Sequence, residues 1–320
     1  MSILIYAESA QNKLKKQALE LCSYGRALAD QLGTEAIALV VNLEDHAQLS
    51  AHGIQKIISI TDADLQDFKA KSYASLIEVV SKQVEAKTIV ISSSADAQYL
   101  APILTAQLQA SYASNVVALP ESTEPFVVKR KAFSSKAFSF TALNNEFKVL
   151  SLAKNSFGAK ENQTDSSEIE YTFEGPRQEN LEVLEVAKSS GQISIADADI
   201  VVSAGRGLKG PENWTMIEDL AEVLGAATAC SKPVSDLGWR PHSEHVGQTG
   251  KPVASNLYIA IGISGAIQHL AGINASKVKV VINSDPEAPF FKAADYGVVG
   301  DAFEVVPQLI EKFKAFKLDN

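Results

Sequence analysis

Short apolar runs alternate with longer amphipathic stretches over residues 1–120, and this alternation restricts the fold of the chain more than any other feature. The runs are typical of buried strands and the stretches of helices, in the order that a parallel sheet covered by helices requires. Expected strands span residues 3–6, 36–41, 56–60 and 88–91, and expected helices span residues 13–32 and 73–84. We therefore predict an N-terminal α/β domain built on a parallel sheet.

The stretch from residue 13 to residue 32 shows why a helix is expected. Its apolar positions recur every three or four residues, which places them on one face of a helix. Gly33 follows the last of them and can adopt the left-handed conformation that ends many helices. The apolar positions are Leu14, Ala18, Leu21, Gly25, Leu28 and Leu32.

The pattern changes between Phe126 and Ala153, where apolar and polar residues alternate with period two. This period is typical of strands with one buried face. Asn144-Asn145 separates two strand-like runs. Because asparagine favours tight turns, we predict an antiparallel hairpin in this region.

Polar and acidic residues dominate the stretch from 159 to 180, which also contains the Gly175-Pro176 break. Such a composition is typical of a linker. An apolar run at 198–202 resumes the strand pattern. We predict two domains, residues 1–190 with an acidic linker near 159–190 and residues 191–320, the second being a doubly wound parallel sheet.

Composition excludes several classes of function. A net charge of −9 argues against nucleic acid as a partner, because nucleic-acid binding depends on clustered Lys and Arg. The two cysteines, Cys22 and Cys230, lack CxxC spacing, which predicts neither a disulfide framework nor a zinc site. The apolar runs are far shorter than the ~20 residues of a membrane helix, and no leader is recognisable before the first strand, so we expect a cytoplasmic, bacterial protein without a membrane span.

A Gly-x-Gly-x-x-Gly pattern, from Gly205 to Gly210, follows the strand expected at 198–202. In dinucleotide-binding turns these glycines let the backbone approach a phosphate. Here Gly210-Pro211 delays the next helix, and Glu222, the acidic candidate for a ribose contact, falls inside that helix. An NAD site is therefore an alternative and not the preferred interpretation.

A second glycine-containing motif spans residues 246–251. Its glycines lie on both sides of Gln248-Thr249, so the backbone can turn tightly and present an amide and a hydroxyl to one point. A hydroxyl can donate or accept a hydrogen bond. The motif is consistent with a ligand-binding turn.

A third motif spans residues 262–269 and lies between an apolar strand and a short helix that Gly272 is expected to close. The start of a helix carries free N–H groups and a partial positive charge. Ser264 and Gly265 are therefore expected to offer an anion site.

Together these motifs resemble the FAD-binding half of the electron transfer flavoprotein alpha subunit. The resemblance is dense from about residue 199 onward, and it is mainly architectural in the first half, where residues 3–8 are similar to the family's first strand. The segments that carry it are Ser203–Lys209, Ala229–Ser231, Val246–Lys251, Gly262–His269, Asn283, Asp285–Pro289, Ala294–Gly297 and Val305–Pro307.

The resemblance implies FAD as the cofactor, with Arg206 on a phosphate, Thr249 near flavin N5 and His269 at the pyrimidine edge. A hydrogen bond donated at that edge would favour the negatively charged form of the one-electron-reduced flavin. Asn283 and Asp301 match positions that hold the adenosine half. The full implied set is Arg206, Ser231, Lys232, Val246, Gly247, Gln248, Thr249, Ser264, Gly265, Ala266, Ile267, Gln268, His269, Asn283, Asp301 and Ala302.

Two residues depart from the family's pattern, and a third has another explanation. Lys232 stands where the family usually has an arginine over the isoalloxazine; lysine keeps the charge but loses the planar surface that stacks on a ring. His245 stands where glutamine is frequent, and we assign it no role. Asp301 precedes apolar residues at helical spacing, so a helix-capping role also explains this aspartate. Capping and cofactor binding can coexist.

The sequence shows no Ser/His/Asp ordering, metal-ligand spacing or P-loop, which favours a carrier over a stand-alone catalyst. The resemblance implies a heterodimer with a beta subunit, for which the N-terminal domain is a platform. This pair would accept electrons from dehydrogenases such as acyl-CoA dehydrogenases and pass them to a quinone oxidoreductase. The alternatives are an electron-bifurcating, NADH-linked form, a soluble NAD-dependent oxidoreductase, and a nucleotide-binding regulatory or scaffold module.

Overall fold

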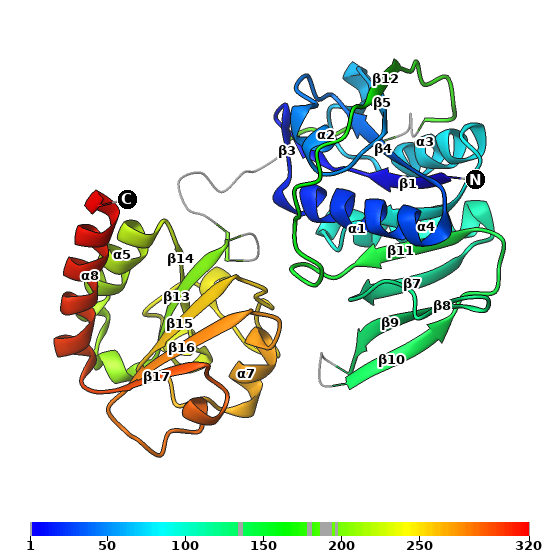
Figure 1. The fold of residues 1–320 in the computed structure, drawn as a ribbon. Helices are drawn as coiled ribbons and strands as arrows, with labels where there is room; N and C mark the ends of the chain where they lie inside the picture. Colours follow the sequence, from blue (N-terminus) through cyan, green and yellow to red (C-terminus); the bar gives the residue numbers. More distant parts are fainter. Residues whose placement is uncertain (1, 134–136, 178–180, 186–193, 196–197, 320) are drawn as a thin grey trace. The chain divides into compact units, whose positions relative to one another are not determined.

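The computed structural model describes residues 2–133, 137–177, 181–185, 194–195 and 198–319. The chain divides into two compact units, residues 1–187 and residues 188–320, each built on its own sheet (Figure 1). The boundary predicted between residues 190 and 191 lies outside the described residues.

The sheet of the first unit has the strand order β10-β9-β7-β11-β6-β1-β4-β5-β12, with β8 paired on β9. From β7 to β12 along this order neighbouring strands are parallel, whereas β9 is antiparallel to both β10 and β7. The strands are β1 (Ser2–Tyr6), β4 (Glu35–Val41), β5 (Lys56–Ile60), β6 (Ala86–Ile91), β7 (Ser111–Val116), β8 (Ser122–Thr123), β9 (Phe126–Ala132), β10 (Ala137–Ala142), β11 (Lys148–Leu152) and β12 (Ser167–Glu170).

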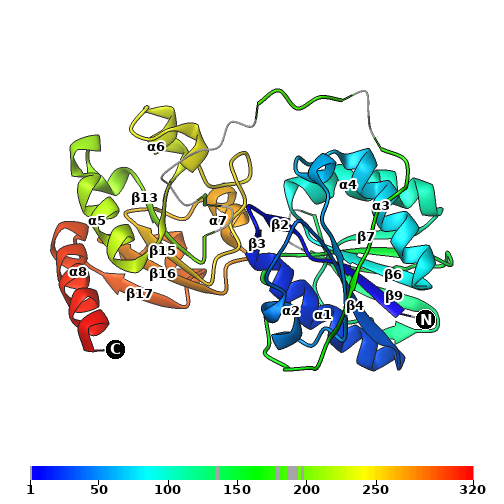
Figure 2. The same ribbon diagram turned by 90° about the horizontal axis from the view of Figure 1, so that it is seen from above.

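Helices cover both faces of this sheet, as a doubly wound sheet requires (Figure 2). One apolar core contains Leu21 and Leu28 of α1, and the other contains Leu76 of α3 and Leu100 of α4. The apolar stripe of α1 is buried, and Gly33 ends the helix with φ 64°, as predicted. The helices are α1 (Lys16–Leu32), α2 (Ala47–Ala51), the 3-10 turn η1 (Ala63–Leu65), α3 (Ala70–Gln83) and α4 (Ala95–Leu108).

Two predictions for the first unit are wrong in detail. Helix α1 begins at Lys16 and not at residue 13, because residues 9–14 form the small hairpin of β2 (Ser9–Ala10) and β3 (Lys13–Leu14). The antiparallel hairpin joins β9 to β10, and Asn144-Asn145 instead precedes β11, which pairs in parallel with β6 and β7. The apolar run of β11 is typical of a strand buried on both faces, which explains this pairing.

The stretch predicted as a linker is partly structured. Residues 167–170 form β12, which pairs in parallel with β5 at the edge of the first sheet. Phe173 is buried in one of the two cores. The segment therefore belongs to the first unit up to this point, and its acidic composition reflects an edge strand whose side chains are exposed. Part of the predicted linker, residues 178–180 and 186–190, lies outside the described residues.

The second unit has a parallel five-stranded sheet with the order β14-β13-β15-β16-β17. Helices α5 and α8 pack on one face of the sheet, where they share one apolar cluster, and α7 packs on the other face against a second cluster (Figure 1). The strands are β13 (Ile200–Ala204), β14 (Ala227–Cys230), β15 (Leu257–Ile261), β16 (Val278–Asn283) and β17 (Tyr296–Val299). The helices are α5 (Thr215–Leu224), α6 (Lys232–Asp236), α7 (Ile267–Ile273) and α8 (Ala302–Asp319), with 3-10 turns η2 (Arg206–Leu208), η3 (Pro211–Asn213), η4 (His242–Glu244) and η5 (Pro289–Lys292).

The predicted α/β class, with a hairpin added to the first sheet and a doubly wound second sheet, is confirmed. Among the described helices, none has the length and apolar character that crossing a bilayer demands.

Candidate functional site

The carboxyl ends of all five strands of the second sheet share one edge, because the strands are parallel. Ligands of open α/β sheets bind at this edge. The segments that leave it are Gly205-Arg206 after β13, Ser231-Lys232 after β14, residues 262–266 after β15, Asn283 at the end of β16 and Gly300-Asp301 after β17. The residues predicted from five separate parts of the sequence therefore line a single edge.

The direction of winding reverses between β13 and β15. From β13 the chain goes to β14 on one side and then returns to β15 on the other, which makes this position the topological switch point. The two loops touch through their backbones, since Gly205 N donates to Ile261 O at 2.9 Å and Gly207 N to Gly262 O at 3.1 Å. A Cβ on Gly207 would lie 2.6 Å from Gly262 Cα. The glycine spacing thus serves the contact between these loops.

The turn at residues 246–251 lies against α7 and the end of β14. Val246 N donates to Cys230 O at 3.0 Å, and Gln248 N donates to Gln268 O at 2.7 Å. The approach is close, because a Cβ on Gly272 of α7 would lie 2.6 Å from Gly247 N. Gln248 and Thr249 are left exposed at the tip. The turn and the third motif are thereby joined in one site.

Helix α7 differs from the expectation in two ways. It begins at Ile267, three residues after Ser264, and it continues past Gly272 to Ile273. Gly272 serves close packing on Gly247 and does not end the helix. With seven residues the helix is about two turns long, so we assign the positive character of the site to cationic side chains and not to a helix terminus.

His269 is buried, with 6% of its surface exposed. Its Nε2 lies 3.0 Å from the Tyr258 hydroxyl. Burial lowers its pKa to about 4; the nearby Val246 backbone carbonyl opposes this shift, and the neighbouring His245 makes a smaller contribution in the same direction as burial. Nδ1 has no well-formed hydrogen bond to any described residue. The ring is therefore neutral near pH 7.

Three cations lie at the edge, and one of them, Lys209, has its Nζ 3.9 Å from a carboxylate oxygen of Asp301. Arg206 is exposed and forms no ion pair within the described parts of the chain. Lys232 is also exposed, and its Nζ is 2.9 Å from both carboxylate oxygens of Asp236, one turn along α6. Arg206 is thus the cation that is most available to an anionic ligand.

Asn283 and Asp301 both have structural contacts. The Asn283 side-chain amide donates to Ile263 O at 3.1 Å, and its oxygen accepts from Asp285 N at 3.0 Å. Asp301 accepts from Phe303 N at 3.0 Å and so caps α8, as the alternative explanation predicts. Neither contact prevents a further bond to a ligand, because each oxygen has a second lone pair.

The remaining predicted residues differ in exposure. Those that are exposed at the edge are Ser264, Ala266, Ile267 and Gln268, in addition to Gln248 and Thr249. Those that are buried and support it are Ser231, Val246, Gly247, Gly265 and Ala302. Ser203, Tyr258 and His245 are buried and were not predicted as site residues. Ser203 and Tyr258 stand inside apolar strands, where a polar residue gives no local sign that it faces a site.

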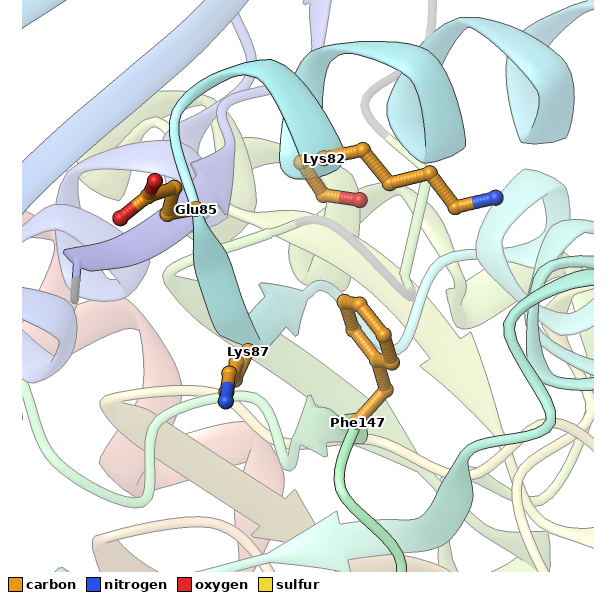
Figure 3. Close-up of a pocket in the computed structure, with 5 residues that line it drawn as sticks. Lys82, Glu85, Lys87 and Phe147 are labelled. Atoms are coloured by element: carbon orange, nitrogen blue, oxygen red, sulfur yellow. The ribbon is translucent and has the colours of Figure 1, made fainter.

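A pocket of about 400 Å³ lies elsewhere, in the first unit (Figure 3). It is lined by residues at the end of α3, the start of β6 and the approach to β11, which is the amino edge of that sheet. Its cations are already paired, Lys82 with Glu78 and Lys87 with Glu146, both at 2.7 Å. We therefore assign it no ligand.

Comparison with known proteins decides the family. Residues 3–174 match the model of the electron transfer flavoprotein domain, and residues 194–274 match that of the electron transfer flavoprotein FAD-binding domain. The chain is 34% identical to the electron transfer flavoprotein subunit alpha of Bacillus subtilis over 99% of its own length and 98% of that protein. The chain belongs to the electron transfer flavoprotein alpha subunit family.

Other relatives agree with this assignment. The electron transfer flavoprotein subunit alpha of Thermoanaerobacterium thermosaccharolyticum is 32% identical, covering 98% of each chain. The FixB protein of Clostridium saccharobutylicum is 32% identical, covering 98% of this chain and 96% of that protein. FAD is the cofactor that the family model assigns to the second unit.

The residues at the edge of the second sheet fit FAD. The dinucleotide is a long anion with a flat ring system at one end. An unpaired guanidinium, Arg206, suits its phosphates. The exposed hydroxyl of Thr249 and the unbonded Nδ1 of His269 suit the polar edges of the ring.

Proposed function

We propose that this chain is the FAD-holding subunit of a two-subunit electron carrier, in which the first unit is the platform for a beta subunit. The pair would take electrons from dehydrogenases such as acyl-CoA dehydrogenases and pass them to a quinone oxidoreductase. The observation that supports the proposal is that the segments carrying Arg206, Thr249 and His269 are joined by backbone hydrogen bonds near the carboxyl edge of the second sheet. We also propose a bacterial cytoplasmic location, which cell fractionation tests.

FAD supplies the redox chemistry when it is bound, and the residues of the chain bind it, orient it and set the local charge. In this proposal Arg206 holds the pyrophosphate, and Thr249 donates to or accepts from the ring at N5. With the Tyr258 hydroxyl donating to Nε2, the proton of the neutral His269 ring is on Nδ1, which then donates to the pyrimidine edge. Buried Ser231 and exposed Lys232 complete the ring end of the site.

An NAD-dependent oxidoreductase is disfavoured by two observations. The glycines at 205 and 207 are required by contact with the loop after β15, and α5 begins only at Thr215 after the η3 turn. Glu222 lies within α5, as expected. The bifurcating form of the family is not favoured over the simple carrier by any contact within the described residues.

The test is an absorption spectrum of the chain co-expressed and purified with an electron transfer flavoprotein beta subunit. We expect a yellow complex with one FAD released per alpha chain on denaturation. An Arg206→Gln variant should still form the heterodimer but bind FAD more weakly. Because one cation is missing, added salt should weaken FAD binding less in the variant than in the wild type. A colourless complex that takes up no added FAD would contradict the proposal.

A further inference from the structure

His245 is a buried imidazole beside the proposed FAD site, with 1% of its surface exposed. It pairs with Cys230 at the end of β14, and its carbonyl accepts from Lys251 N at 2.9 Å. The ring lies under the glycine turn, since a Cβ on Gly250 would be 2.9 Å from its Cγ and one on Gly247 would be 3.5 Å from its Nε2. Its Nδ1 has no hydrogen-bond partner within the described residues.

A second histidine connects this ring with solvent. His242 is exposed, and its ring centroid is 5.2 Å from that of His245. On the other side, Gly247 separates His245 from α7, which carries His269. The turn and this helix are joined by the hydrogen bond from Gln248 N to Gln268 O at 2.7 Å. The three imidazoles therefore lead from the surface to the proposed flavin edge.

The charged groups around His245 come from three directions. Lys232 and Asp236 lie on α6 and are paired with each other. Glu244, next in sequence, is paired with Arg240 at 2.6 Å. Burial raises the pKa of the Cys230 thiol to about 12, so that group is uncharged. The surroundings contain no strong negative charge that is not already paired within the described residues.

These surroundings keep the ring of His245 neutral. Burial is the largest cause of its lowered pKa, followed by His242 and Lys232, and Asp236 opposes them. A new negative charge nearby would reverse this balance and favour protonation. Reduction of a bound flavin supplies such a charge.

We propose, on the basis of the FAD site above, that His242 and His245 conduct a proton from water toward the flavin, and that His245 binds that proton when the flavin is reduced. The electron from the reductant goes to the flavin. The proton comes from water or a buffer acid, whose bond to hydrogen breaks; a new N–H bond forms at Nδ1 of His245, and hydroxide or buffer base is left in solution. His245 is thus a positioning residue that couples reduction to proton uptake.

The test is electrochemical titration of the FAD-loaded heterodimer at several values between about pH 6 and 8. The slope of the reduction potential against pH reports the protons bound per electron. We expect a steeper slope for the wild type than for His245→Gln, which cannot be protonated. For His242→Gln we expect the wild-type slope, with slower proton uptake after rapid reduction, followed with a pH indicator dye.

Equal slopes for the wild type and His245→Gln would overturn the proposal, even if the variant bound FAD more weakly. If His245→Gln does not fold, ¹⁵N spectra of the wild-type histidine rings decide. A shift of His245 to the protonated value on full reduction supports the proposal, and an unchanged ring overturns it. A complex without FAD contradicts the proposed function instead, which keeps the two failures distinct.

Discussion

The carboxyl edge of the first sheet is filled by its own side chains, whereas within the described residues the second sheet has an unpaired cation, Arg206, at this edge, and two buried imidazole nitrogens without hydrogen-bond partners, Nδ1 of His245 and of His269, lie close to it. In the first sheet β1 lies between β4 and β6, so its switch point is beside Glu8. This carboxylate, 2% exposed, accepts from the hydroxyls of Ser92 and Ser94 and from Lys15 Nζ at 2.8 Å.

The difference shows that topology offers a ligand site and side chains decide whether it is used. Ser94 also caps α4, accepting from Ala97 N at 3.0 Å, so the helix start that could face a phosphate is already occupied. A buried carboxylate at this point repels an anion. The nucleotide-binding module considered for the first unit is therefore disfavoured, and FAD is expected only in the second unit.

The largest expected effect on FAD binding comes from a side chain that separates the two loops at the switch point of the second sheet. In Gly207→Val the new side chain meets the Gly262 backbone, which cannot turn away as a side chain can. We predict an FAD affinity lower by about 100-fold, or about 2.7 kcal/mol, measured by titration of the apo heterodimer. Gly225→Ala is the control, because nothing lies within 4 Å of its Cβ; it should lose only stability.

Removing the buried carboxylate at the switch point of the first sheet should lower the free energy of unfolding without changing FAD binding. Glu8→Ala removes the shared acceptor of two hydroxyls and Lys15, at a cost of about 3 kcal/mol in the free energy of unfolding. The figure is at the low end for buried pairs because Lys15 is half-exposed and keeps Asp96 at 3.0 Å. Urea unfolding measures it. A Glu8→Ala variant that could not bind FAD would contradict the conclusion that only the switch point of the second sheet serves the cofactor.

The pH dependence of the free energy of unfolding should reveal the lowered pKa of His269. Its pKa is about 4 in the folded chain and about 6.5 when unfolded, so protonation favours unfolding. The contribution is fully present above about pH 6.5 and is lost as the pH falls toward 4. Between pH 7 and pH 5 we predict a loss of about 2 kcal/mol that His269→Gln does not show. Urea unfolding measures this loss for both proteins. An equal change in the free energy of unfolding of the wild type and of His269→Gln between the two pH values would contradict the prediction.

The smallest effect concerns Lys232. Asp236→Asn removes its partner, which leaves the ammonium free to face the cofactor. Because the pair is exposed, we expect FAD affinity to rise by only a few-fold, less than about 1 kcal/mol. Fluorescence titration detects it, and weaker binding would show that Lys232 lies away from the cofactor.

Strands β13 and β15 and the glycine-containing loops that follow them could be predicted, because apolar runs and glycine motifs are local signals. The hairpin of β9 and β10 and the strand β12 were harder, since pairing partners far apart in sequence decide them. The inward position of the His245 side chain could not be predicted, nor could the way in which Glu8 fills the switch point of the first sheet. Whether a polar side chain after a strand turns toward the sheet depends on contacts such as Ser92 and Lys15, which local sequence does not specify.

The central claim is that FAD binds at the switch point between β13 and β15. Amide hydrogen exchange of the heterodimer, compared before and after FAD is added to the apo form, tests it most directly. We predict slower exchange in segments 205–210, 246–251 and 262–269, and no change in segments 7–15 and 92–97. Protection confined to the first unit, or to the far ends of the second sheet, would contradict the account.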